Sequence, residues 1–202
     1  MITAFYSDPH FGHKNIIKYC NRPFAHVDEM TEELIKRYND VISGPNDTVL
    51  WLGDCGFCKT DMFRNILARM HGRKILVIGN HDRDKSTMAD LGFDLVTDEC
   101  FLSVNGQKCR VKHFPYAYAD PFTDPAKDKY STLRPPRIQG EVLIHGHTHS
   151  PEPLQDNMVH VGVDAWNYAP VGWDTVAELV AKAAQHKWKP IRYYANTNKD
   201  NS

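Results

Sequence analysis

The chain has 202 residues, of which 42% are hydrophobic and 24% charged, a balance that suits one globular domain with a well-packed core. Its formal net charge of −1 gives no general attraction to nucleic acid or to an anionic membrane, so stable binding to nucleic acid is not expected. No apolar run is long enough to span a membrane, Met1–Asp8 turns polar too soon for a secretory signal, and five cysteines, an odd number, favour a reducing cytoplasm over a disulfide framework.

The first half of the chain alternates strand and helix patterns. Short apolar runs that end in glycine or a polar residue predict strands, and apolar residues at helical spacing predict helices. Cys55 and Cys58 form a CxxC pair between two of these elements, but no second pair completes a zinc set, and we expect ordinary free thiols rather than a redox pair. The predicted strands are Ile2–Ser7, Thr48–Leu52 and Lys74–Ile78, and the predicted helices are Val27–Ile42 and Asp61–Met70.

The second half is richer in strands. Asn105-Gly106 suits a type I′ turn and predicts a hairpin, and an amphipathic helix follows later, which Asp174 is expected to cap. The predicted strands are Phe101–Val104, Gln107–Lys112, Glu141–Ile144, Met158–Val163 and Ile191–Tyr194, and the predicted helix is Trp173–His186. We expect one domain over residues 1–195 and a polar tail over 196–202. The fold class is α/β, with two packed sheets and helices outside them.

Metal-capable side chains follow several predicted strands directly. In open α/β sheets the carboxyl ends of the strands form the site, so residues spread over 140 positions can meet at one point. Gly53, Gly79 and Gly146 each precede such a residue, and glycine lets the backbone turn sharply near a crowded centre. The side chains are those of Asp8, His10, Asp54, Asn80, His113, His147 and His149. Seven mixed nitrogen and oxygen donors exceed the needs of one metal and suit two, an arrangement typical of phosphoryl transfer.

These residues resemble the five sequence blocks of the calcineurin-like metallophosphoesterase superfamily. The blocks are Asp8-Pro9-His10, Gly53-Asp54, Gly79-Asn80-His81-Asp82, His113 and Gly146-His147-Thr148-His149, in this order. The segments Phe11–Phe24 and Val161–Pro170 resemble a small single-domain branch found in bacteria and phages. The resemblance implies two mixed β-sheets packed face to face and flanked by helices, an α/β/β/α sandwich.

The resemblance also implies the ligands of two divalent ions, with manganese favoured and iron, zinc or nickel as alternatives. Asp8, His10, Asp54 and His149 would hold one ion; Asp54, as the bridge, would hold the other with Asn80, His113 and His147. A hydroxide bridging the ions would attack phosphorus, and His81 would protonate the leaving group as general acid, with Asn80 also in the catalytic set. The substrate is expected to be a small phosphodiester or a nucleotide; a monoester, or no catalysis at all in a metal-binding scaffold, are the alternatives.

One position departs from the protein-phosphatase branch, where an aspartate follows the bridging aspartate after three residues and pairs with the catalytic histidine. Phe57 stands there, which disfavours a protein phosphatase and leaves His81 without an evident orienting partner. Arg83 and His13 are candidate substrate contacts; a surface ion pair explains Arg83 equally, and a helix-start hydrogen bond is the simpler explanation of His13. A metallo-β-lactamase site is excluded because Ser150-Pro151-Glu152 follows His149, in place of the required aspartate and third histidine.

The segment Phe114–Gly140 contains five prolines and no periodicity, as functional loops often do. Its aromatic and cationic residues suit a stacked base and a phosphate, and Tyr116 and Tyr118 are candidate substrate contacts; a surface loop closed by its own aromatics is the alternative. These residues are Tyr116, Tyr118, Phe122, Lys127, Lys129, Tyr130, Arg134 and Arg137. His145 is expected in the core or behind the ligands, and Asp164 either beside the site or in a turn.

Overall fold

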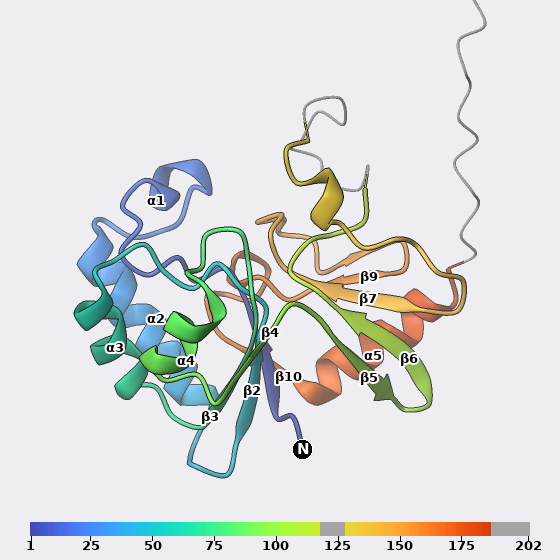
Figure 1. Ribbon diagram of the computed structural model, residues 1–202, viewed down its shortest axis with the longest axis horizontal. Helices are drawn as coiled ribbons and strands as arrows, with labels where there is room; N and C mark the ends of the chain where they lie inside the picture. The colour runs from blue at the N-terminus through green and yellow to red at the C-terminus, as the bar shows by residue number, and fades with distance from the viewer. Residues whose placement is uncertain (118–127, 187–202) are drawn as a thin grey trace, which may run out of the picture.

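The first sheet is built around the three parallel strands predicted in the first half of the chain. The computed structural model describes residues 1–117 and 128–186, and its first sheet has the strand order β10-β1-β2-β3-β4 (Figure 1). Strands β1 to β4 are parallel and β10 joins the edge antiparallel, so the sheet is mixed. The strands are β1 Ala4–Tyr6, β2 Thr48–Trp51, β3 Arg73–Val77, β4 Leu95–Thr97 and β10 Val171–Gly172.

The second sheet, also mixed, has the order β5-β6-β7-β9-β8. Strands β6, β7 and β9 are parallel, whereas β5 and β8 pair antiparallel at the edges. Asn105 and Gly106 both have positive φ, 50° and 85°, between β5 and β6, which confirms the predicted hairpin turn. The strands are β5 Cys100–Val104, β6 Gln107–Val111, β7 Val142–His145, β8 Leu154–Gln155 and β9 Met158–His160.

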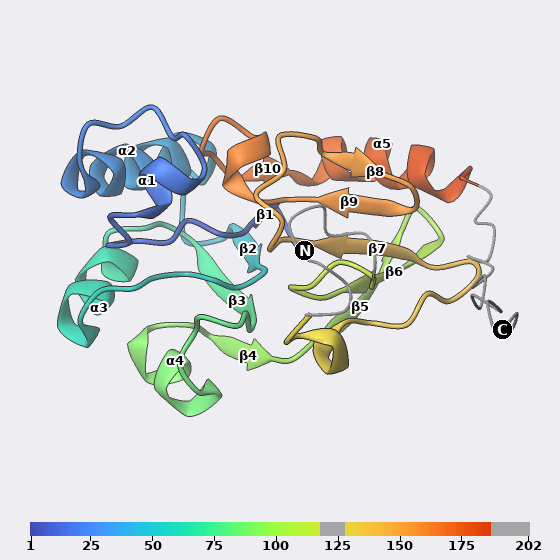
Figure 2. The same cartoon turned by 90° about the horizontal axis from the view of Figure 1, so that it is seen from above.

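Helices α1 to α4 lie on the outer side of the first sheet, and α5 packs against the second sheet and β10 (Figure 2). The three predicted helices are present; α1 and α4 were not predicted. The predicted cap at Asp174 is wrong: Gly172 is the N-cap, and Asp174 already lies in the first turn, where its charge favours the helix dipole. The helices are α1 Ile16–Tyr19, α2 Val27–Val41, α3 Thr60–Ala68, α4 Lys85–Leu91 and α5 Trp173–Ala184, with 3-10 turns at Ser131–Leu133 and Val163–Ala165.

Alternation along the buried strands divides the interior into two cores. On β2, Val49 and Trp51 face helices α1 to α4, whereas Leu50 and the following Leu52 face the second sheet. Strands buried on both faces show continuous apolar runs, which is why the sequence marked them clearly. The expected α/β class with two mixed sheets is therefore confirmed.

Several sequence expectations concern residues or features outside these sheets. All five cysteines are free thiols, as expected for Cys55 and Cys58. Across residues 1–117 and 128–186, no helix is long and apolar enough to cross a membrane. The predicted strand Ile191–Tyr194 and the polar tail 196–202 lie outside the described residues.

Candidate metal centre

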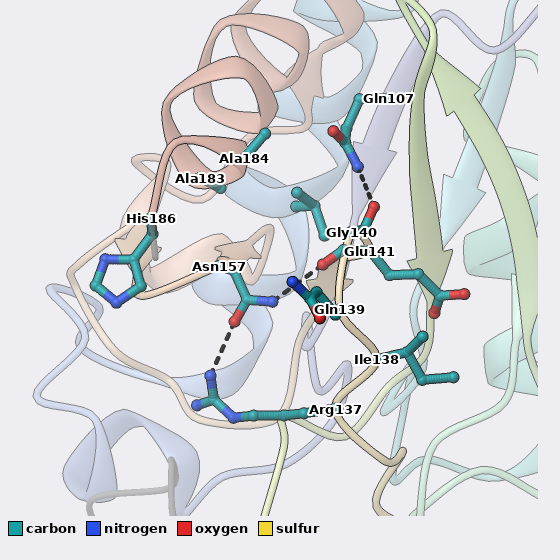
Figure 3. A pocket seen from close by; sticks show the side chains of 11 residues that line it. Gln107, Arg137, Ile138, Gln139, Gly140, Glu141, Asn157, Ala183, Ala184 and His186 are labelled. Carbon is teal, nitrogen blue, oxygen red and sulfur yellow. Dashed lines mark hydrogen bonds between the residues drawn. The ribbon is translucent and has the colours of Figure 1, made fainter. Parts of the chain in front are cut away.

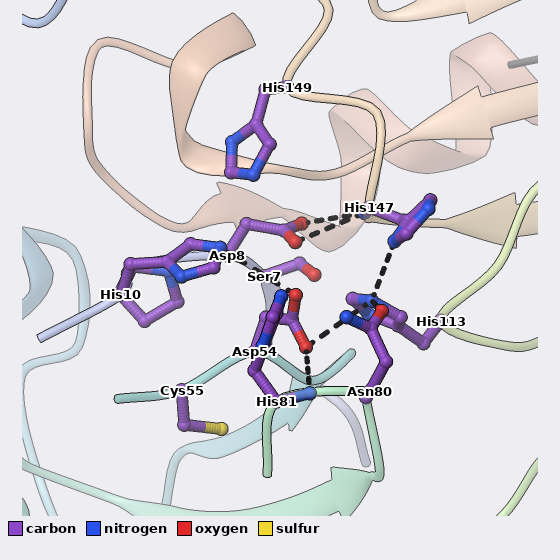
Figure 4. A network of polar contacts seen from close by, with 12 residues as sticks. Ser7, Asp8, His10, Asp54, Cys55, Asn80, His81, His113, His147 and His149 are labelled. Atoms are coloured by element: carbon purple, nitrogen blue, oxygen red, sulfur yellow. Dashed lines mark hydrogen bonds and ion pairs between the residues drawn. The ribbon is translucent and has the colours of Figure 1, made fainter. Parts of the chain in front are cut away.

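Five strand ends deliver polar side chains to one place (Figure 4). Asp8 and His10 follow β1, Asp54 follows β2, and Asn80 follows β3, so the parallel pairing of β1, β2 and β3 brings their carboxyl ends to one edge. His113 follows β6, and His147 and His149 follow β7, its parallel neighbour. A parallel bridge between Ser7 and Gly162 ties the ends of β1 and β9, and so joins the two sheets at this point.

The backbone at these strand ends is unusual. Ten non-glycine residues of the described chain have positive φ, and five of them are predicted ligands: Asp8, His10, Asp54, His147 and His149, with φ between 50° and 71°. Such conformations are disfavoured for residues with a side chain and cluster at functional sites. At Gly146, a Cβ atom would collide with Ser7 Oγ and Asp8 Oδ2, which explains the glycine before His147.

The first group of donors consists of Asp8, His10 and His149. One ligating atom from each lies within 4.8 Å of the others. Both ring nitrogens of the buried His10 lack a hydrogen-bond partner, an arrangement that is costly for a polar ring unless a ligand occupies it. The carboxylate of Asp8 accepts the backbone N–H of His147 through both oxygens, at 3.1 and 2.9 Å, which connects the two strand ends.

The second group consists of Asp54, His113 and His147, whose ligating atoms also lie within 4.8 Å of one another. Asn80 joins it, because its Oδ1 lies 3.1 Å from His113 Nε2. The Nδ1 atom of His147 lies 3.2 Å from the same His113 nitrogen. On its other side, His113 Nδ1 lies 2.5 Å from the carbonyl oxygen of Leu52, so Nε2 is the nitrogen that faces the group.

Asp54 connects the two groups. Its Oδ2 lies 3.6 Å from His10 Nε2, and its Oδ1 lies 3.5 Å from His113 Nε2. Oδ1 also accepts the backbone N–H of His81 at 2.9 Å, which fixes the carboxylate plane. A further carboxylate, that of Asp82, accepts the backbone N–H groups of Asp54, Cys55 and Gly79 at 2.8 to 3.0 Å, and so holds both strand ends in place.

Charge at the centre favours a cation. Burial alone would raise the pKa of Asp54, but the neighbouring His113 outweighs it and holds that pKa well below its usual range. Burial alone would lower the pKa of His113, but the Asp54 carboxylate raises it above the ordinary value. The Asp54 carboxylate thus favours a proton on His113, a demand for positive charge that a divalent ion also meets, whereas burial lowers the pKa of His10 and keeps its ring neutral. The mixture of carboxylate, amide and imidazole donors fits such ions.

His149 is held in place by a buried ion pair, Arg22 and Asp164, which the sequence did not predict. Its Nδ1 lies 2.7 Å from Asp164 Oδ2. Arg22 donates to both oxygens of Asp164, at 2.8 and 2.9 Å, and to the carbonyl oxygens of Pro9 and Asp8, at 2.9 and 2.8 Å. Arg22 therefore joins the loop that carries Asp8 to the carboxylate that contacts His149. Arg22 and Asp164 lie in the segments Phe11–Phe24 and Val161–Pro170, and the resemblance of these two segments to one branch of the superfamily was the only indication of the pair in the sequence.

A cleft of about 740 Å³ opens onto both groups of donors. His81, the predicted general acid, is exposed in it, and so is His13 in part. The ring of Phe57 lies between them, 4.7 Å from the His81 ring and 4.2 Å from the His13 ring, measured between centroids. On the side of the second group, the hydroxyl of Tyr130 accepts from Asn80 Nδ2 at 3.3 Å.

The other predicted substrate contacts lie elsewhere. Tyr116 is 1% exposed, packs on Leu143 and Met158, and lies beneath the guanidinium of Arg137, so it is a core residue and not a substrate contact. Arg83 donates to the carbonyl oxygen of Cys58 at 2.9 Å and does not line the cleft. Tyr118, together with Phe122 and Lys127, lies outside the described residues.

Few of the described aromatic and cationic residues of the segment before β7 reach the cleft. Arg134 is buried and pairs with Asp128, and only Lys129 and Tyr130 of its described aromatic and cationic residues line the cleft. Arg137 faces a separate hollow of about 510 Å³ near the end of α5 (Figure 3), where it donates to Asn157. His145 is buried in β7 and packs against His160, as expected for a residue behind the ligands.

Two proteins of known sequence and one solved structure are similar to this chain over most of its length. The uncharacterized protein MJ1445 of Methanocaldococcus jannaschii is 32% identical over 185 residues, covering 87% of this chain and 89% of the relative. The gene 66 protein of Mycobacterium phage L5 is 32% identical over 201 residues, covering 88% and 93%. The crystal structure of AQ665, a protein of unknown function from Aquifex aeolicus, superposes with a TM-score of 0.71 at 27% identity, covering 89% of this chain and all of that one. No protein-family model matches the chain.

Proposed function

We propose that this chain, which belongs to the same family as the protein MJ1445 of Methanocaldococcus jannaschii and the gene 66 protein of Mycobacterium phage L5, is a two-metal phosphoesterase. The observation that carries the proposal is the position of Asp54, between two groups of converging donors and open to a cleft that contains His81. Two metal sites that share a carboxylate and adjoin a proton donor suit hydrolysis of a phosphate ester.

The donors divide between two ions. Asp8, His10 and His149 would hold one ion, His113, His147 and Asn80 the other, and Asp54 both; this division follows two of the three groups of converging atoms, the third being Cys20, His149 and Asp164. Manganese is the favoured ion, with iron, zinc or nickel as alternatives, because donors without thiolate do not select among them. When bound, the ions would activate a water as nucleophile and stabilise charge on the phosphate oxygens.

His81 supplies the proton. Its backbone N–H is held by Asp54 and its ring contacts Phe57, so the side chain reaches the cleft from a fixed backbone. A proton from its ring neutralises the leaving oxygen as the phosphorus–oxygen bond breaks. Asn80 contributes an uncharged amide beside His113, which adds a ligand without repelling an anionic substrate.

A phosphodiester is favoured over a monoester. Lys129 is the one lysine or arginine among the described residues that line the cleft, and Arg83 is bound to the Cys58 carbonyl instead. A monoester carries more negative charge than a diester near neutral pH and is typically bound by arginine forks. The small number of such groups here suits a singly charged diester or a nucleotide-like substrate.

The test compares an aryl phosphodiester with the matching monoester on protein loaded with manganese, nickel, zinc or magnesium. We expect hydrolysis of the diester, faster than of the monoester, and loss of this activity in Asp54→Asn and Asp54→Ala. The exposed Asp98→Asn is a control that should keep full activity, because this aspartate pairs with Lys85 on the surface. Tight binding of metal without hydrolysis of either ester would instead identify a metal-binding scaffold.

A further inference from the structure

We propose that the leaving group of the substrate is a planar aromatic group, a nucleoside in the natural case, which stacks on an aromatic wall formed by His13, Tyr19 and Phe57. The inference rests on the proposed phosphoesterase function and names the class of substrate for the same site. None of these three residues is a donor in either metal group. All three line the same cleft as the donors.

The wall exposes aromatic carbon where a ligand can reach it. Phe57 is 41% exposed and Tyr19 is 73% exposed, two of the nine exposed large apolar side chains among the described residues. The rings of His13 and Phe57 are stacked, with 4.2 Å between centroids and 20° between planes, and Tyr19 meets His13 edge-on at 6.2 Å. Exposed apolar surface inside a cleft marks a binding site more often than a structural feature.

The position of the wall relative to His81 identifies which part of the substrate it meets. Phe57 lies 4.7 Å from the His81 ring and stacks on the His10 ring at 5.4 Å, so it borders both the proton donor and the first group of donors. A general acid must lie within hydrogen-bond reach of the leaving oxygen. The group attached to that oxygen therefore lies beside Phe57, with Tyr19 farther out on α1.

The distribution of charge points to an uncharged ring. Lys129 and Tyr130 occur together in the cleft, with the lysine ammonium 4.6 Å from the tyrosine ring, and Tyr130 contacts Asn80 and His147 of the second group. The wall itself contributes no lysine or arginine. A leaving group with a further phosphate would meet no cleft-lining lysine or arginine at the wall, whereas a base would find π-faces on which to stack.

The experiment measures binding and needs no turnover. Adenosine 5′-monophosphate and ribose 5-phosphate, which differ by the base, are titrated into manganese-loaded protein by calorimetry. We expect the nucleotide to bind about fivefold or more tightly, the lower end of the contribution of one base–aromatic stack. Tyr19→Ala and Phe57→Leu should each bring the ratio of the two affinities toward one, and Tyr19→Phe should retain it. Phe101→Ala, which removes a half-exposed ring from β5, is the matched control and should leave the ratio unchanged.

Equal affinity for the two compounds in the unaltered protein, or a ratio that survives both Tyr19→Ala and Phe57→Leu, would overturn the inference. Turnover gives a second comparison, between two methyl phosphodiesters with an aryl and a fluoroalkyl leaving group of matched acidity. We expect faster hydrolysis of the aryl ester. Hydrolysis of both esters at equal rates would contradict stacking of the leaving group on the aromatic wall but not the phosphoesterase function. Hydrolysis of neither ester would contradict the phosphoesterase function. In that case the ratio of the two binding affinities still tests whether a base stacks on the wall.

Discussion

The Nδ1 atom of His149 lies 2.7 Å from Oδ2 of Asp164, a carboxylate that is in turn held by the fully buried guanidinium of Arg22. A carboxylate behind a ligating histidine fixes which ring nitrogen faces the metal and how the ring is oriented. Burial alone would lower the pKa of His149, but hydrogen bonds with Asp164 and Cys20 and the charges of Asp8 and Asp164 raise it to about 10. Asp164 thus prepares His149 for a cation without being one of the predicted ligands.

We therefore expect Asp164→Asn to weaken binding of one metal ion by about 10- to 100-fold, the usual cost of losing such a carboxylate. The affected ion is the one assigned to Asp8, His10 and His149, and the ion at His113 and His147 should keep its affinity. Calorimetric titration of metal-free protein with manganese separates the two sites.

Arg22→Lys tests the same connection from the other side. A lysine keeps the charge but cannot donate to both oxygens of Asp164 at once, so the weakening of the same ion should be partial. Asp98→Asn, on the surface, should change neither site. If Asp164→Asn lowered the affinity for both ions equally, Asp164 would act on the fold as a whole and not on His149.

Substitution of His147 and His149 should remove different ions. The two histidines are separated by one residue, yet His149 belongs with Asp8 and His10 and His147 with Asp54 and His113. We expect His147→Ala and His149→Ala each to retain about one ion per chain, measured by elemental analysis after dialysis, because each ion loses one imidazole ligand. Loss of both ions in each variant would contradict the assignment.

Removal of the His81 side chain should lower activity most for esters whose leaving group needs a proton. For diesters with an alkoxide leaving group, we expect His81→Ala to reduce kcat by about 100-fold or more, the usual range for a general acid. For a 4-nitrophenyl ester, whose leaving group is stable as an anion, the loss should be much smaller. The metal content should stay at the level of the unaltered protein, and an equal loss for both esters would rule out the role of proton donor.

Stability at acidic pH should depend on Glu141, which is far from the cleft. Its side chain is 2% exposed and bonds to Lys108 at 2.6 Å and to Arg110 at 3.3 Å. Burial alone would raise the pKa of Glu141, but these two cations outweigh it and lower that pKa below its ordinary value of 4.5. The contribution of Glu141 is thus fully present above about pH 4.5 and is lost as the pH falls through the lowered folded-state pKa.

Glu141→Gln should accordingly lower the free energy of unfolding at neutral pH by about 1.5–3 kcal/mol, the range for hydrogen bonds to charged groups. The difference from the unaltered protein should shrink below about pH 4.5. Urea denaturation across this range measures it. A difference that stays constant with pH would mean that the carboxylate charge does not contribute.

Local sequence was enough to predict the residues at the strand ends. An apolar run, a glycine and a metal-capable residue recur along the chain, and the structure places Asp54, His113 and His147 within reach of one another. Helices α1 and α4 were not predicted because they span only 4 and 7 residues, too few to show a helical period. Tyr116 was misplaced because an aromatic residue in a proline-rich loop has the same local pattern whether it is buried or exposed.

By itself, the sequence determined which residues end the strands, because a buried strand, its glycine turn and the polar residue after it are neighbours in the chain. Tertiary structure alone decided that Arg22 and Asp164, 142 positions apart, form the pair behind His149. It also decided that the ring of Phe57 contacts the ring of His81. Such partners depend on how two sheets and a loop pack together, and the free energy of that packing is distributed over the whole core, so no local pattern encodes it.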